Sequence, residues 1–485
     1  MPDLPFPIHT AFVVLYLLVL VGLGLWKSGK ITNQEEFSLA GRNLGVIVLV
    51  GTLLATWIGT GSIFGNAEQT YKIGLGAFVI PLGGVLGILV LSTLAGRIRR
   101  IEGVSIQDIL DARFGRAARF LASVTLILAY VIIVSYQYRA GASVLERLVP
   151  QLDPTVATCI VAGFVIAYTA LAGMVSVAYT DLANGILITV GIFIALPLLF
   201  VEAGGSSGIR ETLAKPEMRE IATFGHELTP FNFINWCLPA FLLILGDANM
   251  YQRFFSAKSP SVAKRSAILM IIGIAILEVA IVAVAFLGRV LVEQGVLQAP
   301  EKQSDIIVSL AFDVLPPVLG AVLMGTIIAV VVSTADSFLL APATAIVRDL
   351  TRRETAREQR DHGRREVLLS RAIVVVFGLV ALVLAFQSKS FFKVALFAYT
   401  VYGASVTPVL IATFFWKGAT TQGAVASMLA GSGVALWWQW MQLEKNFTSP
   451  ALANIDAVLP ALLAACVALV VVSLLTQPAT ATKRE

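Results

Sequence analysis

Charged residues are scarce in this chain of 485 residues, where Asp, Glu, Lys and Arg together make up 13%. Soluble domains carry about 25%. The hydrophobic residues, 57% of the total, fall in uninterrupted blocks, and about 20 apolar residues in helical form cross a bilayer. Such helices satisfy their own backbone hydrogen bonds in lipid. The shortage of charge therefore excludes a soluble protein and predicts an all-α integral membrane protein.

Cysteine and histidine are nearly absent. The three cysteines (Cys159, Cys237 and Cys466) lie far apart in apolar blocks, so no disulfide framework or redox motif is indicated. All three histidines fall in predicted loops, and no cluster has the spacing of a metal site or an activated nucleophile. We therefore expect no enzyme and no cofactor. The net charge of +5 is explained by membrane topology, and no nucleic-acid partner is expected.

Apolar blocks between charged breaks predict about 13 transmembrane helices. Their centres lie near Leu18, Ala55, Leu86, Ile127, Val165, Ile192, Leu242, Ala275, Ile327, Phe377, Gly403, Gly431 and Val467. The first block follows no basic segment and precedes no cleavage site, so it is expected to be a retained span and not a signal peptide.

Basic residues indicate the orientation in the membrane. Most of the 35 Lys and Arg residues fall on one set of alternating segments, which include the arginine-rich connector from Arg348 to Arg371 and the tail with Lys483 and Arg484. The positive-inside rule places these segments in the cytoplasm. The protein is then expected in a plasma (bacterial inner) membrane, with its N-terminus outside, its C-terminus inside and residues 206–230 as an extracellular loop.

The second predicted span contains features that a plain lipid-facing helix lacks. It reads LLATWIGTGSIFGNAEQTYKIG, with Gly59, Gly61 and Gly65 near its middle and small hydroxyl residues between them. Glycines permit unwinding, and the freed carbonyls then need partners. Close packing of neighbouring helices through small residues is the alternative interpretation.

The seventh predicted span is also weakened, by Pro239 and Gly246, and it carries Asp247. An ionisable residue within a span is a functional candidate by default, although Asp247 could instead be an interfacial acid paired with Arg253. The second and seventh spans lie five spans apart. Interrupted helices at matching positions of two halves are typical of the central site of a transporter.

The ninth predicted span contains adjacent hydroxyls at Ser333 and Thr334, followed by Asp336. A hard cation such as sodium prefers oxygen ligands, and these hydroxyls could complete a shell begun by carbonyls of the broken second span. The alternative is that both hydroxyls bond back to their own helix. The residues alone leave the two interpretations open.

Five segments in this order resemble the sodium:solute symporter family, which includes sodium–glucose, proline, pantothenate, sialic acid and choline transporters. The segments are FSLAGRNLG, ATWIGTGSIFG, GMVSVAYTDL, STADSFLL and YGASVTPVLIATFFWKGATTQGA. The resemblance covers nearly the whole chain. It implies a leucine-transporter-like fold of two inverted repeats of five helices, with one extra helix before this core and two after it.

The resemblance also implies an organisation of the chain into segments. These are an extra N-terminal helix in residues 1–30, a first repeat in 40–205, the extracellular loop 206–230, a second repeat in 231–418, and two helices with a short tail in 419–485.

A sodium site is carried over from the family by its motifs. The match to ATWIG implies carbonyl ligands from Ala55 and Ile58, and the match to STADS implies hydroxyl ligands from Ser333 and Thr334 with the carbonyl of Val330 one turn earlier. Asp181 and Asp336 are implied as residues of sodium exit and coupling. The family often has Gln where this chain has Asn184.

The family's solute approaches the broken helices. By that analogy the substrate-binding residues are Trp57, Ser62, Asn66, Glu68, Tyr71, Gln137, Tyr138, Asp247, Asn249 and Gln252. The second span looks nearest to the choline-transporter branch. That branch places an aromatic residue on the sixth core helix, which has no match in this chain; the nearest position holds Asp247. An indole and a carboxylate would still suit a cationic or zwitterionic amine.

The expected function is a sodium-coupled symporter, functional as a monomer, that imports a small polar organic solute such as an amino acid or an amine. Proton coupling on the same architecture is an alternative, because carboxylates lie in or near spans at Glu68, Asp181, Asp247, Glu278 and Asp336. A non-transporting sensor or passive channel is an alternative of another class. The sequence leaves open which solute is carried and how many sodium ions accompany it.

Overall fold

A computed structural model of the chain describes residues 8–28, 34–101, 103, 105–225, 227–351, 359–387, 390–442 and 455–477. The basic connector lies partly outside these described residues, and the tail with Lys483 and Arg484 lies wholly outside them.

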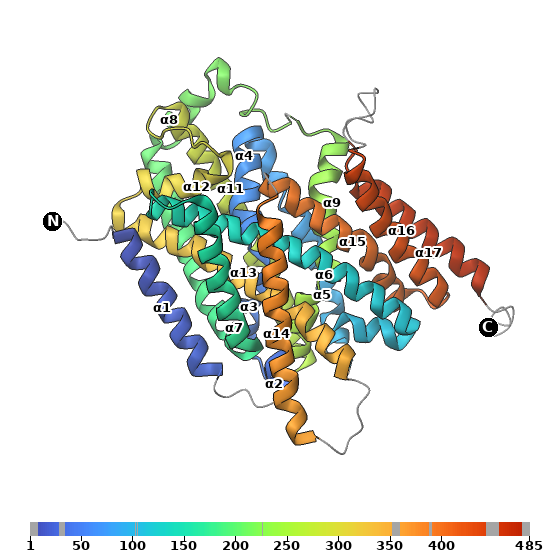
Figure 1. Ribbon diagram of the computed structural model, residues 1–485. Helices are drawn as coiled ribbons and strands as arrows, with labels where there is room; N and C mark the ends of the chain where they lie inside the picture. Colours follow the sequence, from blue (N-terminus) through green and yellow to red (C-terminus); the bar gives the residue numbers. More distant parts are fainter. Residues whose placement is uncertain are drawn as a thin grey trace.

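The described chain is helical almost throughout (Figure 1). The long α-helices are α1 (Ile8–Ser28), α3 (Val46–Trp57), α5 (Leu82–Ile98), α6 (Ile106–Leu148), α7 (Pro154–Glu202), α9 (Pro230–Gly246), α11 (Pro260–Glu293), α13 (Pro317–Thr351), α14 (Gln359–Ala385), α15 (Phe391–Phe415), α16 (Thr421–Trp440) and α17 (Val458–Thr476). The shorter α-helices are α2 (Gln34–Leu39), α4 (Ala67–Ile73), α8 (Gly205–Leu213), α10 (Ala248–Ser256) and α12 (Ile306–Ser309). The 3₁₀ and π segments are η1 (Ala40–Arg42), η2 (Gly61–Asn66), η3 (Gly74–Val79), η4 (Pro216–Met218), η5 (Gln303–Asp305) and η6 (Leu310–Val314).

Among the described residues, nine helices are long and apolar enough to cross a membrane, and the bent pair Val46–Trp57 with Gly61–Val79 makes a tenth. Two shorter apolar helices, Ile8–Leu23 and Leu82–Ile98, add to these. Together with the 20-residue α16, they contain every predicted span centre. The all-α membrane architecture is confirmed.

The long helix α7 supplies two of these spans. The Tyr168 hydroxyl donates a hydrogen bond to the Thr180 hydroxyl at 2.9 Å. In a straight helix, twelve residues would separate them by about 18 Å, which is too far for these side chains to meet. The chain therefore bends sharply between the segments Pro154–Leu171 and Ser176–Glu202, each of which passes the membrane-span criterion.

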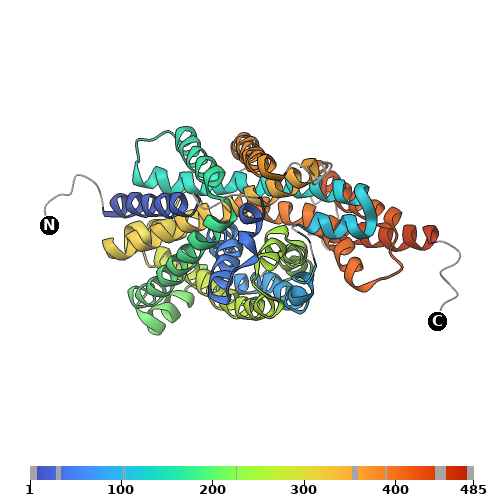
Figure 2. The same ribbon diagram turned by 90° about the horizontal axis from the view of Figure 1, so that it is seen from below.

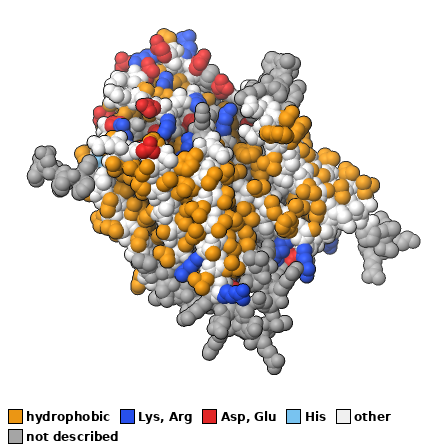
Figure 3. Space-filling model, viewed as in Figure 1, with side chains coloured by type: hydrophobic (Ala, Val, Ile, Leu, Met, Phe, Trp, Pro, Cys, Tyr) orange, Lys and Arg blue, Asp and Glu red, His pale blue; other side chains and the backbone are white. Residues whose placement is uncertain are grey.

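Exposed apolar side chains lie on many of the long helices. Large apolar side chains that are more than half exposed include Ile47, Phe120, Val383 and Leu463. Figure 3 shows such side chains across the middle of the visible face, with acidic and basic residues gathered above them and basic residues below them. In lipid these side chains face acyl chains, so their exposure carries no cost in contact with water.

The site lies where the most enclosed helices meet. In α13, 83% of the most apolar stretch is buried, because the helix packs against α3, α6 and α7. The helix α15 packs against α6 and α9, whereas α16 and α17 pack mainly on each other and on α15. Figure 2 shows α16 and α17 at the end of the molecule opposite α1.

Candidate functional site

The second span is broken between α3 and η2. Helix α3 ends at Trp57, and Ile58 has a ψ of 89°, which takes its carbonyl out of helical geometry. The chain resumes at Thr60 and passes through the π-helical η2 into α4, and the two halves are bent by 49°. The predicted break is confirmed at Ile58 and Gly59, but the stretch around Gly65 is helical.

The seventh span changes direction at Asp247. Helix α9 ends at Gly246, Asp247 is extended, and α10 starts at Ala248. The Asp247 carboxylate accepts hydrogen bonds from the backbone N–H groups of Asn249 at 2.7 Å and Met250 at 3.3 Å, and from the Tyr130 hydroxyl at 2.9 Å. The acid therefore caps its own helix. It is not paired with Arg253 and does not line the cavity described below.

The predicted sodium ligands converge at the first break. The Ser333 hydroxyl donates to the Ala55 carbonyl at 3.1 Å and to the Val330 carbonyl at 3.3 Å, so it bonds both across to α3 and back to its own helix. The Thr334 hydroxyl is buried and has no hydrogen-bond partner among the described residues. A Cβ at Gly59, next to Ile58, would lie 3.1 Å from that hydroxyl oxygen.

The two hydroxyls and the carbonyls around them form an oxygen-rich junction between α3 and α13. Its members are neutral oxygens, the ligand type that hard cations take. An unpartnered buried hydroxyl requires an explanation, and an ion ligated by Thr334 would provide one. The residues thus fit the sodium ion that the sequence predicts as the transported co-ion.

The acids Asp181 and Asp336 lie beside this junction in a buried polar network. Asp181 accepts hydrogen bonds from the Thr52 hydroxyl at 2.6 Å and from Arg253 at 3.1 Å. Arg253 also donates to the Ser337 hydroxyl at 2.7 Å, and Ser337 donates to Asp336 at 3.3 Å. The network joins α3, α7, α10 and α13, and the side chains of Arg253 and Asp181 are 1% and 0% exposed.

A cavity of about 50 Å³ opens on the η2 side of the break. Trp57, Ser62 and Asn66 line it as predicted, together with Glu278 from α11 and Tyr399 from α15. The Ser62 hydroxyl donates to Glu278 at 2.6 Å, and the Asn66 amide donates at 3.0 Å. Three of the ten candidate substrate residues are therefore gathered around one buried carboxylate.

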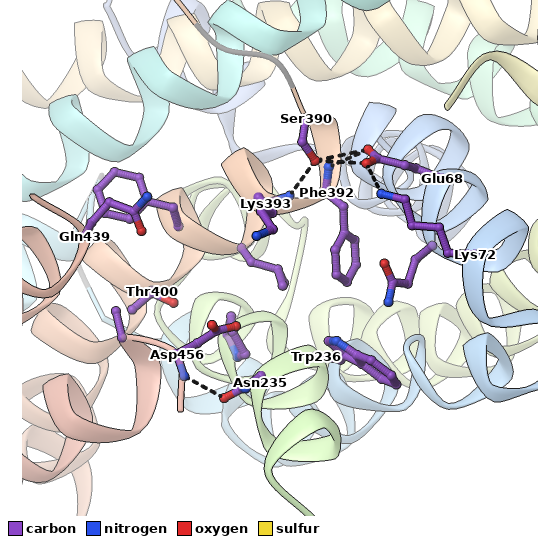
Figure 4. Close-up of a pocket in the computed structure, with 15 residues that line it drawn as sticks. Glu68, Lys72, Asn235, Trp236, Ser390, Phe392, Lys393, Thr400, Gln439 and Asp456 are labelled. Atoms are coloured by element: carbon purple, nitrogen blue, oxygen red, sulfur yellow. Dashed lines mark hydrogen bonds and ion pairs between the residues drawn. The ribbon is translucent and has the colours of Figure 1, made fainter. Parts of the chain in front are cut away.

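A larger cavity of about 180 Å³ lies next to the first and shares Trp236, Phe392 and Leu396 with it. We call this larger cavity the vestibule. Figure 4 shows Glu68 and Ser390 at one end of it, and Asn235 and Asp456 at the other. Glu68 accepts hydrogen bonds from Lys72 at 2.7 Å, from the Ser390 hydroxyl at 3.1 Å, and from the backbone N–H of Phe392 at 3.4 Å. Glu68 thus lines the vestibule and not the inner cavity.

The remaining candidate substrate residues do not line either cavity. The Arg289 guanidinium lies 4.7 Å from the centre of the Tyr71 ring, and Tyr138 packs towards Gly378. Gln252 donates to the carbonyl of Ser38 at 2.7 Å.

The side chains of Gln137 and Asn249 are buried without a hydrogen-bond partner in the described part of the chain. The Gln137 amide nitrogen would lie 3.6 Å from a Cβ at Gly59. Gln137 is therefore near the broken span, on the side of the sodium junction.

Two features of the site did not follow from the sequence. The sequence indicates Glu278 only as a proton-relay candidate, although its position within an apolar span marks it as a functional candidate by default. The sequence offers Arg253 as a partner for Asp247, but Arg253 pairs with Asp181. No signal in the sequence identifies this pairing, because 72 residues separate the two partners.

Solved structures share this architecture. A substrate-bound, outward-open Na⁺-coupled sialic acid symporter matches with a TM-score of 0.80 at 18% identity, covering 97% of this chain and 98% of the other. The transporter MhsT in complex with L-phenylalanine matches with a TM-score of 0.60 at 13% identity, covering 89% and 98%. These similarities show the leucine-transporter-like fold, which confirms the predicted fold class.

Relatives in sequence are transporters as well. The chain is 26% identical to the high-affinity proline transporter PutP of Bacillus subtilis (strain 168) over 87% of this chain and 89% of that protein. It is 22% identical to a sodium/proline symporter of Staphylococcus aureus (strain JH9) over 96% and 92%. The model of the sodium:solute symporter family matches residues 37–431, and this chain, a multi-pass membrane protein, belongs to that family.

Proposed function

We propose that this protein is a sodium-coupled symporter that imports a small polar organic solute by alternating access. The observation that carries the proposal is the junction of Ser333 with the Ala55 carbonyl at 3.1 Å, next to the unpartnered hydroxyl of Thr334. An ion at this junction would hold α13 against the end of α3. Membership of a sodium:solute symporter family supports the assignment of the ion.

In this mechanism sodium enters from outside and stabilises the arrangement in which the solute cavity is formed. Coupling of this kind is a free energy shared between two sites, and it acts in both directions. One charge moving down 100 mV releases about 2.3 kcal/mol, and a tenfold sodium gradient adds about 1.4 kcal/mol. One sodium ion would then sustain an accumulation of several hundredfold.

The N-terminus is proposed to face outward and the C-terminus the cytoplasm, in a bacterial plasma membrane. The first residues of α1 contact the segment η6, where His9 stacks on Phe312, whereas the end of α17 contacts the α15–α16 connection through Thr476 and Thr420. These two ends lie on opposite faces of the bundle (Figure 1). The basic residues of the sequence favour the second face as cytoplasmic.

The moving parts are proposed to be the two repeats, residues 40–205 and 231–418. Each repeat has a broken helix near its start, at Ile58 and at Asp247. Irregular backbone is tolerated at membrane depth where it lines a cavity or is buried in protein. The assignment of residues 1–30 and 419–485 as peripheral helices is consistent with the outlying positions of α1, α16 and α17 (Figure 2).

The solute is proposed to be an amino acid or an amine. The inner cavity of about 50 Å³ has room for a small head group. The relatives named above are proline transporters, whereas the likeness to the choline branch stays a prediction from one segment.

Proton coupling is the second candidate. It is favoured by the buried acids Asp181, Asp336 and Glu278, of which the first two each have a carboxylate oxygen without a partner among the described residues. In that case uptake would follow a pH gradient and persist without sodium.

Replacing Thr334 by Ala tests the sodium site in proteoliposomes. We expect the sodium concentration for half-maximal uptake to rise about tenfold or more, because one of the few oxygen ligands is lost. The control is Thr326→Ala on the same helix, since its hydroxyl already donates to the carbonyls of Leu187 and Val322 at 3.0 Å. An unchanged sodium dependence in Thr334→Ala would contradict the proposed sodium site. Absence of solute accumulation by the wild-type protein would favour a sensor or a channel.

A further inference from the structure

Glu278 lies in the middle of α11 and is 3% exposed. One of its carboxylate oxygens accepts from the Ser62 hydroxyl at 2.6 Å, and the other accepts from the Asn66 amide at 3.0 Å. The Trp57 side chain lines the same cavity as this carboxyl group. Among the described residues, no Lys or Arg nitrogen lies within 4.0 Å of the Glu278 carboxylate, and Glu278 takes part in none of the ion pairs found there.

The groups around Glu278 suit an ionised carboxylate. The Asn66 amide nitrogen is a donor only, and hydrogen bonds to the charged form favour that form. A buried charge is nevertheless costly unless it is paired. The described residues supply hydrogen bonds but no positive partner, and a carboxylate with about four acceptor positions retains capacity for another donor.

The cavity beside Glu278 has the other features of a cation site. Trp57, Trp236, Phe392 and Tyr399 line it, and aromatic rings attract cations that lie within about 6 Å of their faces. The lining residues that the structure describes include no basic side chain. A Cβ at Gly61 would lie 2.8 Å from the Tyr399 hydroxyl, and one at Gly84 would lie 2.5 Å from the Trp57 ring. The absence of a side chain at these two glycines therefore lets Tyr399 and Trp57 pack directly against the backbone.

We propose that the transported solute carries a protonated amine, which occupies this cavity with an N–H group towards Glu278 and with the aromatic side chains around its apolar part. The inference rests on the proposed transport function and names the chemical class of the solute. It moves the recognising carboxylate from Asp247, which caps α10, to Glu278. A free amino acid satisfies this chemistry, because its carboxylate can point out of the cavity towards the vestibule, where Lys72 and Lys393 lie.

The inference makes a sharp distinction between solutes of the same shape. Replacing the amine N–H by an ether oxygen turns a donor into an acceptor and removes the charge, so the analogue would face Glu278 with two acceptors in contact. A site built around a buried polar partner rejects such analogues strongly. The oxygen analogue should therefore fail even though its size is unchanged.

The test uses the purified full-length protein in lipid nanodiscs, with thermal stability as the measure of binding. The probes are pyrrolidine, which is protonated at neutral pH, L-proline, and tetrahydrofuran-2-carboxylate, the oxygen analogue of proline, each at millimolar concentration with and without sodium. We expect the two amines to stabilise the protein in sodium and the oxygen analogue to have no effect. In Glu278→Gln the apparent affinity for both amines should fall about tenfold or more.

Two further variants keep the result interpretable. Glu278→Asp retains the charge and should retain the preference for amines, whereas Glu293→Gln, the same change near the end of α11, should behave as the wild type. A cooperative thermal unfolding transition without ligand reports whether each variant is folded. Equal stabilisation by amine and oxygen analogues, no stabilisation by either amine, or an amine preference that survives Glu278→Gln would overturn the inference.

The same measurements separate this inference from the transport proposal. If sodium stabilises the protein but amines are not preferred, only the proposal of amine recognition is contradicted. If amines are preferred but sodium has no effect, only the proposal of sodium coupling is contradicted. Uptake into proteoliposomes is measured in addition: if Glu278→Gln abolishes its pH dependence and leaves the amine preference intact, Glu278 carries a coupling proton and the inference is wrong.

Discussion

The Ser333 hydroxyl lies 3.1 Å from the carbonyl oxygen of Ala55, although 278 residues separate the two along the chain. This contact joins the enclosed helix α13 to the last turn of α3, one turn before the chain leaves helical geometry at Ile58. Both partners are fully buried. An ion or a larger side chain at this contact would therefore change the distance between α3 and α13.

A substitution at Gly59 would crowd the contact between α3 and α13. A Cβ at this position would lie 3.1 Å from both the hydroxyl oxygen and the methyl carbon of Thr334, which is tighter than ordinary contact. We expect Gly59→Ala to raise the half-saturating sodium concentration for uptake several-fold by crowding the Thr334 oxygen. Gly163→Ala in α7 is the control, because a Cβ there meets nothing within 4 Å. Equal effects of the two changes would contradict the sodium junction.

The buried pair of Arg253 and Asp181 should be strongly coupled. Removing one partner leaves an uncompensated buried charge, which costs about 3–5 kcal/mol. We expect Asp181→Asn and Arg253→Met each to lower the thermal stability strongly, and the double variant to lose less than the sum of the two. Arg147→Ala serves as control, because its pair with Asp313 is 44% and 37% exposed and contributes about 0–1 kcal/mol. Strict additivity in the cycle would show that the buried pair is not coupled.

Glu68 should control access from the vestibule to the inner cavity. It connects α4 to the start of α15 through Ser390 and the backbone of Phe392, and Phe392 lines both cavities. In a background with Cys159 and Cys466 changed to Ser, we expect Glu68→Ala to speed labelling of Ala395→Cys by a membrane-impermeant thiol reagent. Lys72→Ala should have a smaller effect, since Lys72 is 45% exposed. Unchanged labelling in Glu68→Ala would exclude this gating role.

Asp305 in η5, outside the membrane spans, should make stability depend on pH. Burial raises the pKa of this carboxyl group to about 6, against the opposing effects of Lys302 and the Ser304 hydroxyl. Because the folded state then binds the proton more tightly than the unfolded state, stability falls as pH rises towards 6. Asp305 should thus contribute to an increase in melting temperature between pH 7 and pH 5, and Asp305→Asn should reduce this increase.

The opposite sign is expected at Asp153, which is exposed at the start of α7. Hydrogen bonds from the backbone N–H groups of Val156 and Thr155 lower the pKa of its carboxyl group, so its contribution is present at neutral pH and is lost as pH falls through that pKa. Asp153→Asn should therefore leave the increase between pH 7 and pH 5 in place. If both variants show the same pH profile as the wild type, Asp305 is not the responsible group.

The spans and the first break were determined by the sequence alone. The length of an apolar block is a local property, and burial in lipid requires a helix wherever such a block occurs. Glycine at position 59 and the adjacent hydroxyls at Ser333 and Thr334 are also local features. They indicated a possible contact between α3 and α13, whereas the distance of 3.1 Å comes from the tertiary structure.

The surroundings of the buried charges were decided only by the tertiary structure. Asp247 turns into α10, Arg253 reaches Asp181, and Glu278 meets Ser62 and Asn66. In a soluble helix the polar face identifies the side that is exposed, but a membrane helix such as α11 is apolar on nearly every side. The sequence therefore shows that a charge is inside the membrane, while the rotation of each helix and its neighbours determine which groups that charge meets.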